Sequence, residues 1–380
     1  MTRAVLVTKQ VPWPSTSGAA LRESNVAAML GTVVDDVHVV GFGAQPDQAL
    51  VPEGVTVHAF EGSDDVRGTL AAGSLVIGRW FSAAMARRVA SLLTPGTHLH
   101  VGFPHMAVAV PAVSRIDSLD LHNVESDLLA QRAARRDPVQ RRLLAAEVWR
   151  MRAWERRLGA EVPIVSCVSE NDRRRLLALG VDALVAPNGA VLPAEPTPPS
   201  GDTVAFVGSL DWEPNEEGVL WFARQVWPHL RAARPATRVT VAGRSPGPAL
   251  TGLHVDGVDV RGDVPAVGPV YTGSALAICP LLTGGGSRLK IVEALAHGRP
   301  VVSTRLGAEG MEDLWGHGVV VADDPREFAG TVARLLADPA ELARLSAEGR
   351  AAVARSWSWE ATLRPLRDRI VQKIERGAGR

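Results

Sequence analysis

Short, continuous apolar runs alternate with amphipathic stretches along the first half of the chain. We predict a strand for each run, at residues 4–8, 37–41, 55–60, 75–78, 99–102, 164–168 and 183–186. The stretches between them, such as residues 18–30 and 83–93, have their apolar positions at helical spacing. Apolar strands that alternate with helices are typical of a parallel sheet covered on both faces. This pattern predicts an α/β domain whose ligands bind in the loops that follow the strands.

The second half of the chain repeats this alternation. Its predicted strands are residues 204–207, 238–242, 258–261, 275–279, 300–303 and 319–322. Between the halves lies VLPAEPTPPSG, whose prolines favour a stiff connector. We therefore predict two doubly wound, Rossmann-like domains that face each other across a cleft. The predicted boundaries are 1–190 for the first domain, 191–201 for the linker, 202–355 for the second domain and 356–380 for a C-terminal helical segment.

Residues 281–300, LLTGGGSRLKIVEALAHGRP, are the segment around which the second domain is organised. An apolar strand leads into a glycine triplet, and an amphipathic helix follows that Gly298 ends. This layout directs backbone N–H groups and a helix N-terminus at an anion. Arg288 and Lys290 lie in the first helical turn, where the macrodipole disfavours cations, so we predict a bound polyanion such as a diphosphate. The alternative is that Lys290 and Glu293 form an ordinary i,i+3 surface pair.

The composition is that of a globular protein, with 46% hydrophobic and 22% charged residues in 380. Lys plus Arg and Asp plus Glu number 41 each, so no global charge favours nucleic acid or a membrane. Cys167 and Cys279 each lie in an apolar run, which indicates buried thiols in a reducing compartment. The N-terminus has no signal-peptide pattern and no apolar run approaches ~18 residues, so we expect a cytoplasmic protein.

Residues 126–159 are predicted to form one or two long helices, broken near Asp137 and Pro138. An apolar stripe at helical spacing includes Val148 and Met151, and the rest of the segment is rich in arginine. The simplest interpretation is a solvated helix face. The alternative, favoured by the tryptophans at Trp149 and Trp154, is contact with an anionic membrane surface or a lipid-linked acceptor.

Several common site motifs are absent or incomplete. The G-x-S-x-G match at residues 243–247 has Pro246 after the serine, and a proline lacks the N–H that an oxyanion hole needs, so we interpret it as a turn. The Gly41-Phe42-Gly43 segment lacks the third glycine of a dinucleotide-binding pattern. No two aspartates have the spacing D-x-D. An enzyme that handles a diphosphate without a metal must supply the cations itself, and Arg288 and Lys290 are the candidates.

Several motifs in order along the chain resemble the group-1 glycosyltransferases, family 4, which have the two-domain GT-B fold. They are DLHNVES at 120–126, APNGA at 186–190, FVGSLDWEPNEEGVLWF at 206–222, GDV at 262–264 and GGGSRLKIVEALAHGRPVVST at 284–304. The resemblance is strongest over residues 203–310. It implies that the last helix crosses back to the N-terminal domain, which would hold the acceptor, while the second domain would hold the nucleotide-sugar.

The resemblance implies a retaining hexosyl transfer from a nucleotide-diphospho-sugar, with no metal ion or other cofactor. Arg288 and Lys290 would hold the diphosphate, and Glu293 would bind the ribose hydroxyls. Gly18 would approach the phosphates, and His122 would touch the donor sugar across the cleft from Arg288. Val264 would contact the base through its backbone. The remaining donor-binding candidates are Ser209, Gly285, Gly286, Ser287 and Leu289.

The sequence departs from the family pattern at three places. The first position of the family's E-x7-E motif is Gly285. The family's arginine after the strand glycine and its lysine in the next helix are here Ser209 and Glu216 or Glu217. Positive charge is therefore expected from Arg288 and Lys290 alone.

Alternative functions on the same fold are a nucleotide-sugar epimerase, an enzyme that couples a non-sugar cyclitol, and a catalytically silent partner that binds nucleotide-sugar. Expected partners are the donor and a small-molecule, glycan or lipid-linked acceptor, with no nucleic acid.

Overall fold

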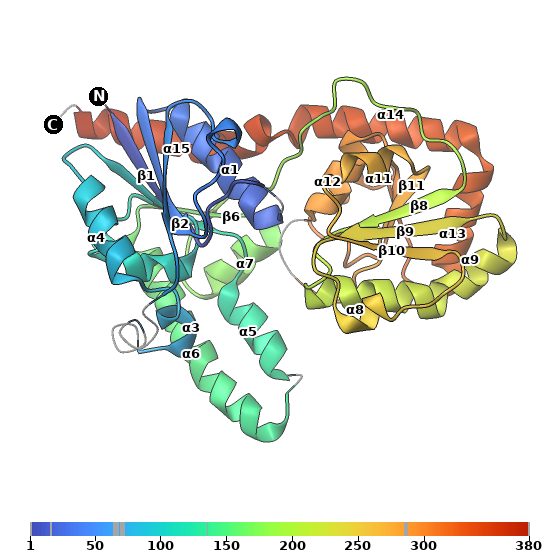
Figure 1. Cartoon of the computed structure of the whole chain (residues 1–380), viewed down its shortest axis with the longest axis horizontal. Helices are drawn as coiled ribbons and strands as arrows, with labels where there is room; N and C mark the ends of the chain where they lie inside the picture. The colour runs from blue at the N-terminus through green and yellow to red at the C-terminus, as the bar shows by residue number, and fades with distance from the viewer. Residues whose placement is uncertain are drawn as a thin grey trace. The chain divides into compact units, whose positions relative to one another are not determined.

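The structure of the chain is a computed structural model, and it describes residues 2–15, 17–63, 68, 73–134, 136–284 and 288–378. Contacts divide the chain into two compact units (Figure 1). The first unit is Met1–Pro187 with Thr362–Arg380, and the second is Asn188–Ala361. The proline-rich residues 191–201 thus belong to the second unit. Arg350 Nη2 donates to the carbonyl oxygen of Pro193 at 2.6 Å, and Arg299 Nη2 donates to Thr197 Oγ1 at 2.6 Å.

The first unit contains a seven-stranded sheet in the order β3-β2-β1-β4-β5-β6-β7. Every strand pair in it is parallel. The strands are β1 (Arg3–Val7), β2 (Asp36–Phe42), β3 (Val55–Phe60), β4 (His98–Val101), β5 (Ser118–Leu121), β6 (Ile164–Cys167) and β7 (Leu184–Val185). Its longer helices are α1 (Gly18–Gly31), α4 (Ala83–Leu92), α5 (Glu125–Ala134), α6 (Pro138–Glu161), α7 (Glu170–Ala178) and α15 (Trp359–Ala378). The strand order reverses between β1 and β4, and ligands of such sheets bind beside that point, outside the carboxyl ends of the strands.

The strand predicted at residues 75–78 is wrong, because this segment is a short helix, α3 (Leu75–Gly78). Ser74 caps the helix by accepting a hydrogen bond from the Ile77 N–H. Ser74 Oγ in turn donates to Glu147 of α6 at 2.6 Å, and the Val76 N–H donates to the same carboxylate at 3.2 Å. These tertiary contacts to a residue 73 positions away outweigh the local strand preference of an apolar run.

The second unit contains a six-stranded sheet in the order β10-β9-β8-β11-β12-β13, and its strand pairs are parallel. The strands are β8 (Thr203–Val207), β9 (Arg238–Gly243), β10 (Val258–Gly262), β11 (Leu276–Cys279), β12 (Val301–Ser303) and β13 (Val319–Val321). The helices include α8 (Glu213–Trp221), α9 (Trp227–Ala233), α10 (Pro248–Thr251), α11 (Gly268–Thr272), α12 (Leu289–Ala296), α13 (Pro325–Ala337) and α14 (Pro339–Ser356). A π-helical turn, η4 (Phe222–Val226), joins α8 to α9.

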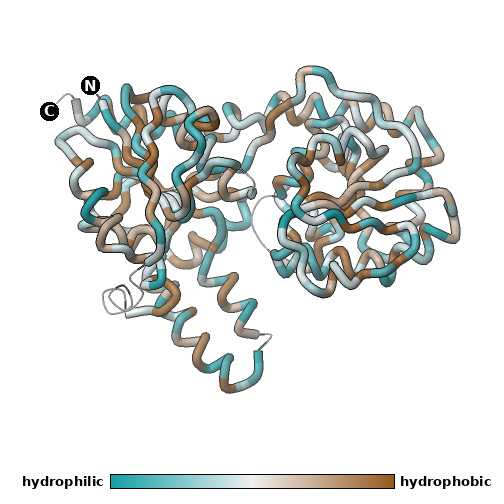
Figure 2. The backbone as a smooth tube through the Cα atoms, viewed as in Figure 1, coloured by the Kyte–Doolittle hydropathy of each residue, from teal (hydrophilic) through white to brown (hydrophobic). Residues whose placement is uncertain are grey.

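Both faces of the second sheet are buried, as its apolar runs predicted. Val204 and Phe206 of β8 belong to one hydrophobic cluster, whereas Ala205 and Val207, which alternate with them, belong to another. Figure 2 shows hydrophobic residues along the strands inside each unit. The prediction of two doubly wound parallel-sheet domains is confirmed. In this unit the strand order reverses between β8 and β11, so the loops after these strands are the expected ligand site.

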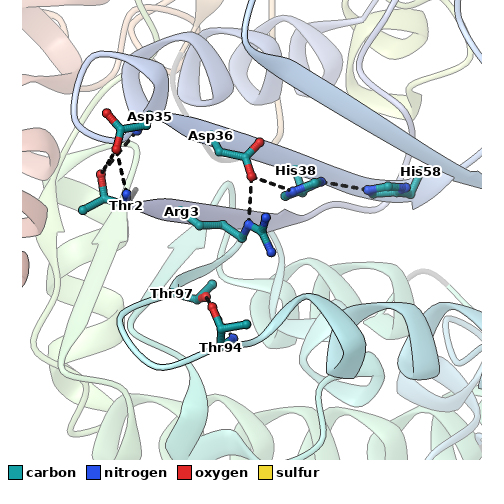
Figure 3. A network of polar contacts seen from close by, with 8 residues as sticks. All are labelled: Thr2, Arg3, Asp35, Asp36, His38, His58, Thr94 and Thr97. Atoms are coloured by element: carbon teal, nitrogen blue, oxygen red, sulfur yellow. Dashed lines mark hydrogen bonds and ion pairs between the residues drawn. The ribbon is translucent and has the colours of Figure 1, made fainter.

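A row of polar side chains connects the first three strands of the first unit (Figure 3). Arg3 Nε donates to Asp36 Oδ2 at 2.8 Å, and His38 Nε2 lies 3.0 Å from the same oxygen. Nδ1 of His38 is 2.9 Å from Nε2 of His58. Burial and Arg88 lower the pKa of His58 to about 4, so this ring is neutral at neutral pH. The row therefore ties the strands together with one ion pair and neutral rings, and we interpret it as structural.

Gly243 at the end of β9 provides a test of how closely the strand ends pack. A Cβ at this position would lie 1.7 Å from the carbonyl oxygen of Gly208. Because this oxygen belongs to the backbone, no change of side-chain rotamer could relieve the clash. We expect Gly243→Ala to lower the free energy of unfolding by ~1–3 kcal/mol, measured by denaturant titration. The control is Gly330→Ala in α13, where a Cβ meets nothing within 4 Å and should stabilise by ~0.5–1 kcal/mol. Equal effects of the two substitutions would contradict the close approach.

Candidate active site

In the second unit the loop between β11 and α12 carries most of the predicted donor site. Gly284 has φ +104, and a Cβ there would lie 3.0 Å from the indole of Trp212, so both the backbone and the space require glycine. The predicted donor-binding residues Gly285, Gly286 and Ser287 lie outside the described residues. Arg288 is the next described residue, and it immediately precedes α12.

Arg288 is 3% exposed, and main-chain carbonyls hold its side chain. Nη2 of Arg288 donates to the carbonyl oxygens of Gly284 at 3.3 Å and Leu306 at 3.2 Å. These two carbonyls belong to the loops that follow β11 and β12. The guanidinium group is therefore positioned by two loops at the carboxyl edge of the sheet.

Lys290, in the first turn of α12, points at the loop after β8. Its Nζ donates to Oδ1 of Asn215 and lies 4.3 Å from the centroid of the Phe206 ring. Among the described residues no carboxylate lies within 4.0 Å of Nζ. Burial, with a smaller contribution from Arg288, lowers the pKa of Lys290 to about 8. In the part of the chain that the structure describes, the ammonium group thus has hydrogen-bonding and aromatic contacts but no ion-pair partner.

Asn215 of α8 connects Lys290 to Ser209, and the sequence interpretation missed this residue. Nδ2 of Asn215 donates to the carbonyl oxygen of Ser209 at 2.7 Å, and the Asn215 side chain is 3% exposed. A Cβ at Gly208 would lie 2.7 Å from Asn215 Nδ2 and 3.1 Å from Lys290 Nζ. The strand glycine therefore leaves the space in which the amide and the ammonium meet. The position of Gly208 directly after β8 is the sequence signal for the contact between Asn215 and Lys290.

Glu293 lies one turn after Lys290, and the two side chains do not form an ion pair within 4.0 Å. The i,i+3 surface pair that the sequence left open is therefore not observed. Burial raises the pKa of Glu293 to about 7, although Lys290 opposes the shift. Leu289, also predicted to bind the donor, is half-buried and packs against the hydrophobic cluster under α12.

A hydrogen bond connects the loops that follow β9 and β10. Ser245 and Asp263 both have positive φ, at 50° and 52°, and the Ser245 N–H donates to Asp263 Oδ1 at 2.9 Å. Val264, predicted to contact the base, follows this turn and packs partly buried against the core. Gly243 ends β9, and residues 244–247 form a loop with a bend at Arg244 and Ser245.

Arg244 adds a third cation at this edge, where two were expected. Its Nε donates to Ser209 Oγ at 3.3 Å, and its Nη2 is 3.9 Å from Asp211 Oδ2. Ser209 occupies the position at which the resemblance led us to expect an arginine, and a guanidinium group from the loop after the neighbouring strand β9 reaches that serine. The sequence signal for this cation is the position of Arg244 directly after a predicted strand.

In the first unit, His122 follows β5 and lies among three buried charged side chains. Its Nε2 is 3.0 Å from Oε1 of Glu23 and 3.5 Å from Oδ2 of Asp120. Arg22 donates to both oxygens of Asp120, at 2.6 and 2.9 Å. Arg22, Glu23 and Asp120 are 0% exposed, and the His122 ring lies 4.0 Å from that of Phe103. The sequence interpretation missed these partners, although Arg22 and Glu23 are the two charged residues of α1.

The buried carboxylates control the protonation of His122. Burial lowers the pKa of His122, but Asp120 and Glu23 outweigh this effect and raise it above its usual value. Burial raises the pKa of Glu23, whereas Arg22 and His122 hold the pKa of Asp120 well below its usual range despite its burial. A Cβ at Gly102 would lie 2.1 Å from Glu23 Oε1, so glycine is required for the carboxylate to fit. Protonated His122 is a hydrogen-bond donor at both ring nitrogens.

The loop after β1 is close to the same strand ends. Lys9 Nζ lies 4.3 Å from the ring centroid of Trp80 and 5.4 Å from that of Phe103. Burial lowers the pKa of Lys9, although Glu125 opposes the shift. Gly18 is the first residue of α1, and Ser17 caps this helix by accepting from the Ala20 N–H. Gly18 and His122 thus lie in the first unit and the other described candidates in the second.

Comparisons with known proteins identify the second unit. A family model described as glycosyl transferases group 1 matches residues 201–338. This segment contains β8 to α13 and every candidate of the second unit. Residues 201–338 form a group 1 glycosyltransferase domain. The domain is that of a transferase, so the predicted enzyme class is confirmed for it.

A curated relative matches a segment of similar length to the family model. An uncharacterized 44.6 kDa protein in the cps region of Klebsiella pneumoniae is 29% identical over 136 residues. The match covers 33% of this chain and 35% of the relative, so the chain spans about a third of that relative's length.

Solved structures resemble the chain over nearly its whole length. Sucrose-phosphate synthase from Thermosynechococcus elongatus aligns with a TM-score of 0.71 at 16% identity, covering 99% of this chain and 100% of that one. Anabaena HepE in complex with UDP and glucose aligns with a TM-score of 0.67 at 15% identity, covering 96% and 98%. S. aureus TarM with fondaparinux, alpha-GlcNAc-glycerol and UDP gives 0.71 at 9% identity, covering 97% and 99%. At these identities the likeness shows the fold, and the predicted GT-B fold is confirmed.

The contact between Glu23 and His122 can be tested in solution. We expect Glu23→Gln to lower the pKa of His122, because the substitution removes one of the two carboxylates that favour the imidazolium form. The measurement is an NMR pH titration of the ring protons, with His122 assigned from the spectrum of His122→Asn. Glu53→Gln, at an exposed position of the same unit, is the matched control and should leave the titration unchanged. An unaltered His122 pKa in Glu23→Gln would contradict the observed pairing.

Proposed function

We propose that the chain is a family 4 glycosyltransferase that moves a sugar from a nucleotide-diphospho-sugar to an acceptor hydroxyl. We further propose that the anomeric configuration is retained and that no metal ion is needed. The observation that carries the proposal is the placement of Arg288 and Lys290 at the N-terminal turn of α12, beside the point where the strand order reverses. Two cations at a helix N-terminus oppose the macrodipole unless an anion lies between them and the helix.

The charge state of Lys290 supports a diphosphate ligand. Its side chain is half-buried, and no carboxylate of the described residues lies within 4.0 Å of its ammonium group, so burial lowers its pKa. A bound diphosphate would supply the missing negative charge and favour the protonated form. As the bond to the sugar breaks, charge accumulates on the leaving diphosphate, and preorganised cations stabilise that charge more than the ground state. Arg288 and Lys290 are proposed for this role, and Arg244 is proposed to orient the loop at Ser209.

The remaining candidates have supporting roles in the proposal. Glu293 has a carboxylate whose burial raises its pKa, and two vicinal ribose hydroxyls would satisfy both of its oxygens. Val264 is proposed to contact the base through its backbone. In the first unit, protonated His122 is proposed to donate a hydrogen bond to a hydroxyl of the donor sugar, and Gly18 to approach the phosphates.

The proposed reaction is tested by incubating the protein with a panel of nucleotide-diphospho-sugars in EDTA. We expect one donor to raise the melting temperature and to be hydrolysed slowly without an acceptor. Loss of this turnover with EDTA and its return with magnesium or manganese would overturn metal independence. Conversion of the free donor to an isomer would indicate an epimerase instead. Binding without any turnover would indicate a silent nucleotide-sugar partner.

Arg288→Ala should reduce turnover more than donor binding. Loss of one preorganised contact to a developing charge typically costs ~3 kcal/mol, about a hundredfold in rate. The measurement is kcat and donor KM of the variant with the donor identified above. Arg326→Ala, at an exposed position of α13, is the control for loss of a guanidinium group from the same unit. If Arg288→Ala keeps the kcat of the control, the anion site lies elsewhere.

Glu293→Gln should affect donor KM more than kcat, because the ribose is remote from the reacting bond and contributes uniform binding. We expect KM to rise ~10-fold or more, since charge-assisted hydrogen bonds contribute ~1.5–3 kcal/mol each. The pKa of Glu293 near 7 adds a second expectation. The carboxylate is the binding form, so wild-type donor affinity should weaken as the pH falls through about 7.

The same variant separates the two effects. Because Gln does not titrate, Glu293→Gln should lose the acid limb of the affinity profile. It should keep the alkaline limb that begins near the Lys290 pKa of about 8. An unchanged KM together with an unchanged acid limb would exclude the ribose role.

A further inference from the structure

Helices α5 and α6 form an antiparallel hairpin that extends away from the sheet of the first unit (Figure 1). From Glu147 onwards α6 is anchored by buried residues, among them Val148, Met151 and Leu158. Its N-terminal part has little cover, because residues 138–143 are all exposed. The outer half of this hairpin therefore lacks a partner within the described chain.

Large apolar side chains are concentrated on this outer part. Val139, Leu143 and Trp149 are 70%, 69% and 70% exposed. Four other large apolar side chains are exposed in the described residues, and they lie on different elements. With ~100° per residue in an α-helix, the three positions fall within about one third of the helix circumference. Two exposed small residues, Ala146 and Ala153, lie in the same sector.

The charge within and around this sector is positive, because exposed Arg142 and Arg150 fall in the sector as well. Arginines Arg132, Arg136, Arg141, Arg142 and Arg156 are exposed, and none forms an ion pair within 4.0 Å among the described residues. The one exposed acid at the turn is Asp137, whose carboxylate already accepts from the Val139 and Gln140 N–H groups. The guanidinium groups at the end of the hairpin are thus available to an anionic partner.

A groove of about 420 Å³ separates the two helices on the side of Trp149. It is lined by alanines and two larger apolar side chains, and by three arginines: Ala130, Ala133, Ala134, Ala145, Val148, Trp149, Arg141, Arg152 and Arg156. Arg152 is 3.7 Å from Asp127, whereas Arg141 and Arg156 form no ion pair within 4.0 Å among the described residues. A lining of apolar side chains and guanidinium groups matches a ligand with a negatively charged head and a hydrocarbon body.

We propose that the α5–α6 hairpin docks on the surface of a bilayer that contains anionic phospholipids. In this arrangement α6 lies in the interface, with Val139, Leu143 and Trp149 in the acyl boundary and the arginines at the phosphates. Tryptophan at the level of the headgroups and arginine beside it are the usual anchors of such helices. A nucleic acid would match the arginines but would leave the three apolar side chains in water. None of the described helices is long and apolar enough to span a membrane, so the contact is peripheral.

The proposal is tested by co-sedimentation of the full chain with vesicles. One set contains about equal parts phosphatidylglycerol and phosphatidylcholine, and the other contains phosphatidylcholine alone. We expect binding to the anionic vesicles that weakens as salt is raised, because the attraction is screened. No binding to the anionic vesicles, or equal binding to both sets, would overturn the proposal.

Matched variants locate the surface. The double variant Arg142→Gln with Leu143→Ser should reduce partition into anionic vesicles at least about tenfold, as should Trp149→Ser. The control double variant, Arg174→Gln with Leu177→Ser, replaces an exposed arginine and a 52% exposed leucine on α7 and should bind as the wild type does. All of these positions are exposed, so melting temperatures should stay unchanged and exclude misfolding. Equal loss in both double variants, or full binding by Trp149→Ser, would overturn the assignment to the hairpin.

Discussion

The requirement that both faces of each parallel sheet be covered determines where polar chemistry can occur in this protein. Alternate residues of β8 enter different hydrophobic clusters, so neither side of that strand offers a place for a charge. Polar side chains that must reach a ligand are therefore confined to the loops that leave the strands. Ser209, Arg244 and Arg288 follow β8, β9 and β11 in this way, and His122 follows β5. The site is a consequence of how the core is built.

The two units treat buried charge differently. In the first unit, Arg22, Glu23, Asp120 and His122 form a group of two acids and two bases, so the cost of removing each charge from water is offset by a neighbour. In the second unit, Lys290 has an amide oxygen and an aromatic ring as its contacts, and its pKa falls. A compensated group stabilises one conformation, whereas an uncompensated ammonium group favours the arrival of an anion. This difference is the physical basis for assigning the diphosphate to the second unit.

Sequence reasoning was sufficient for the features that depend on local pattern. The apolar runs located the strands of the second sheet, and the glycine triplet followed by a helical period located α12. It was insufficient where a contact joins distant segments. Arg22 and Asp120 are 98 positions apart, Lys290 and Asn215 are 75 apart, and Ser74 and Glu147 are 73 apart. Nothing in the local pattern around Glu23 or Asn215 indicates which side chain they meet, because that depends on the three-dimensional course of the chain.

Helix α6 shows how one element can be divided between two tasks. Its inner half is held by carboxylates that point into the first unit: Glu147 accepts from Ser74 and Val76, and Glu155 accepts from the Ser126 N–H at 3.2 Å. Burial raises the pKa of Glu155 to about 7, because removing the carboxylate from water disfavours its charged form. Beyond Glu147 towards the N-terminus, no buried side chain anchors the helix, and Asp137 caps its first turn. A capped helix that is anchored at one end and uncovered at the other presents its exposed side chains at the regular spacing of the helix. That geometry lowers the entropy lost when a partner binds, so the uncovered half of α6 is suited to recognition.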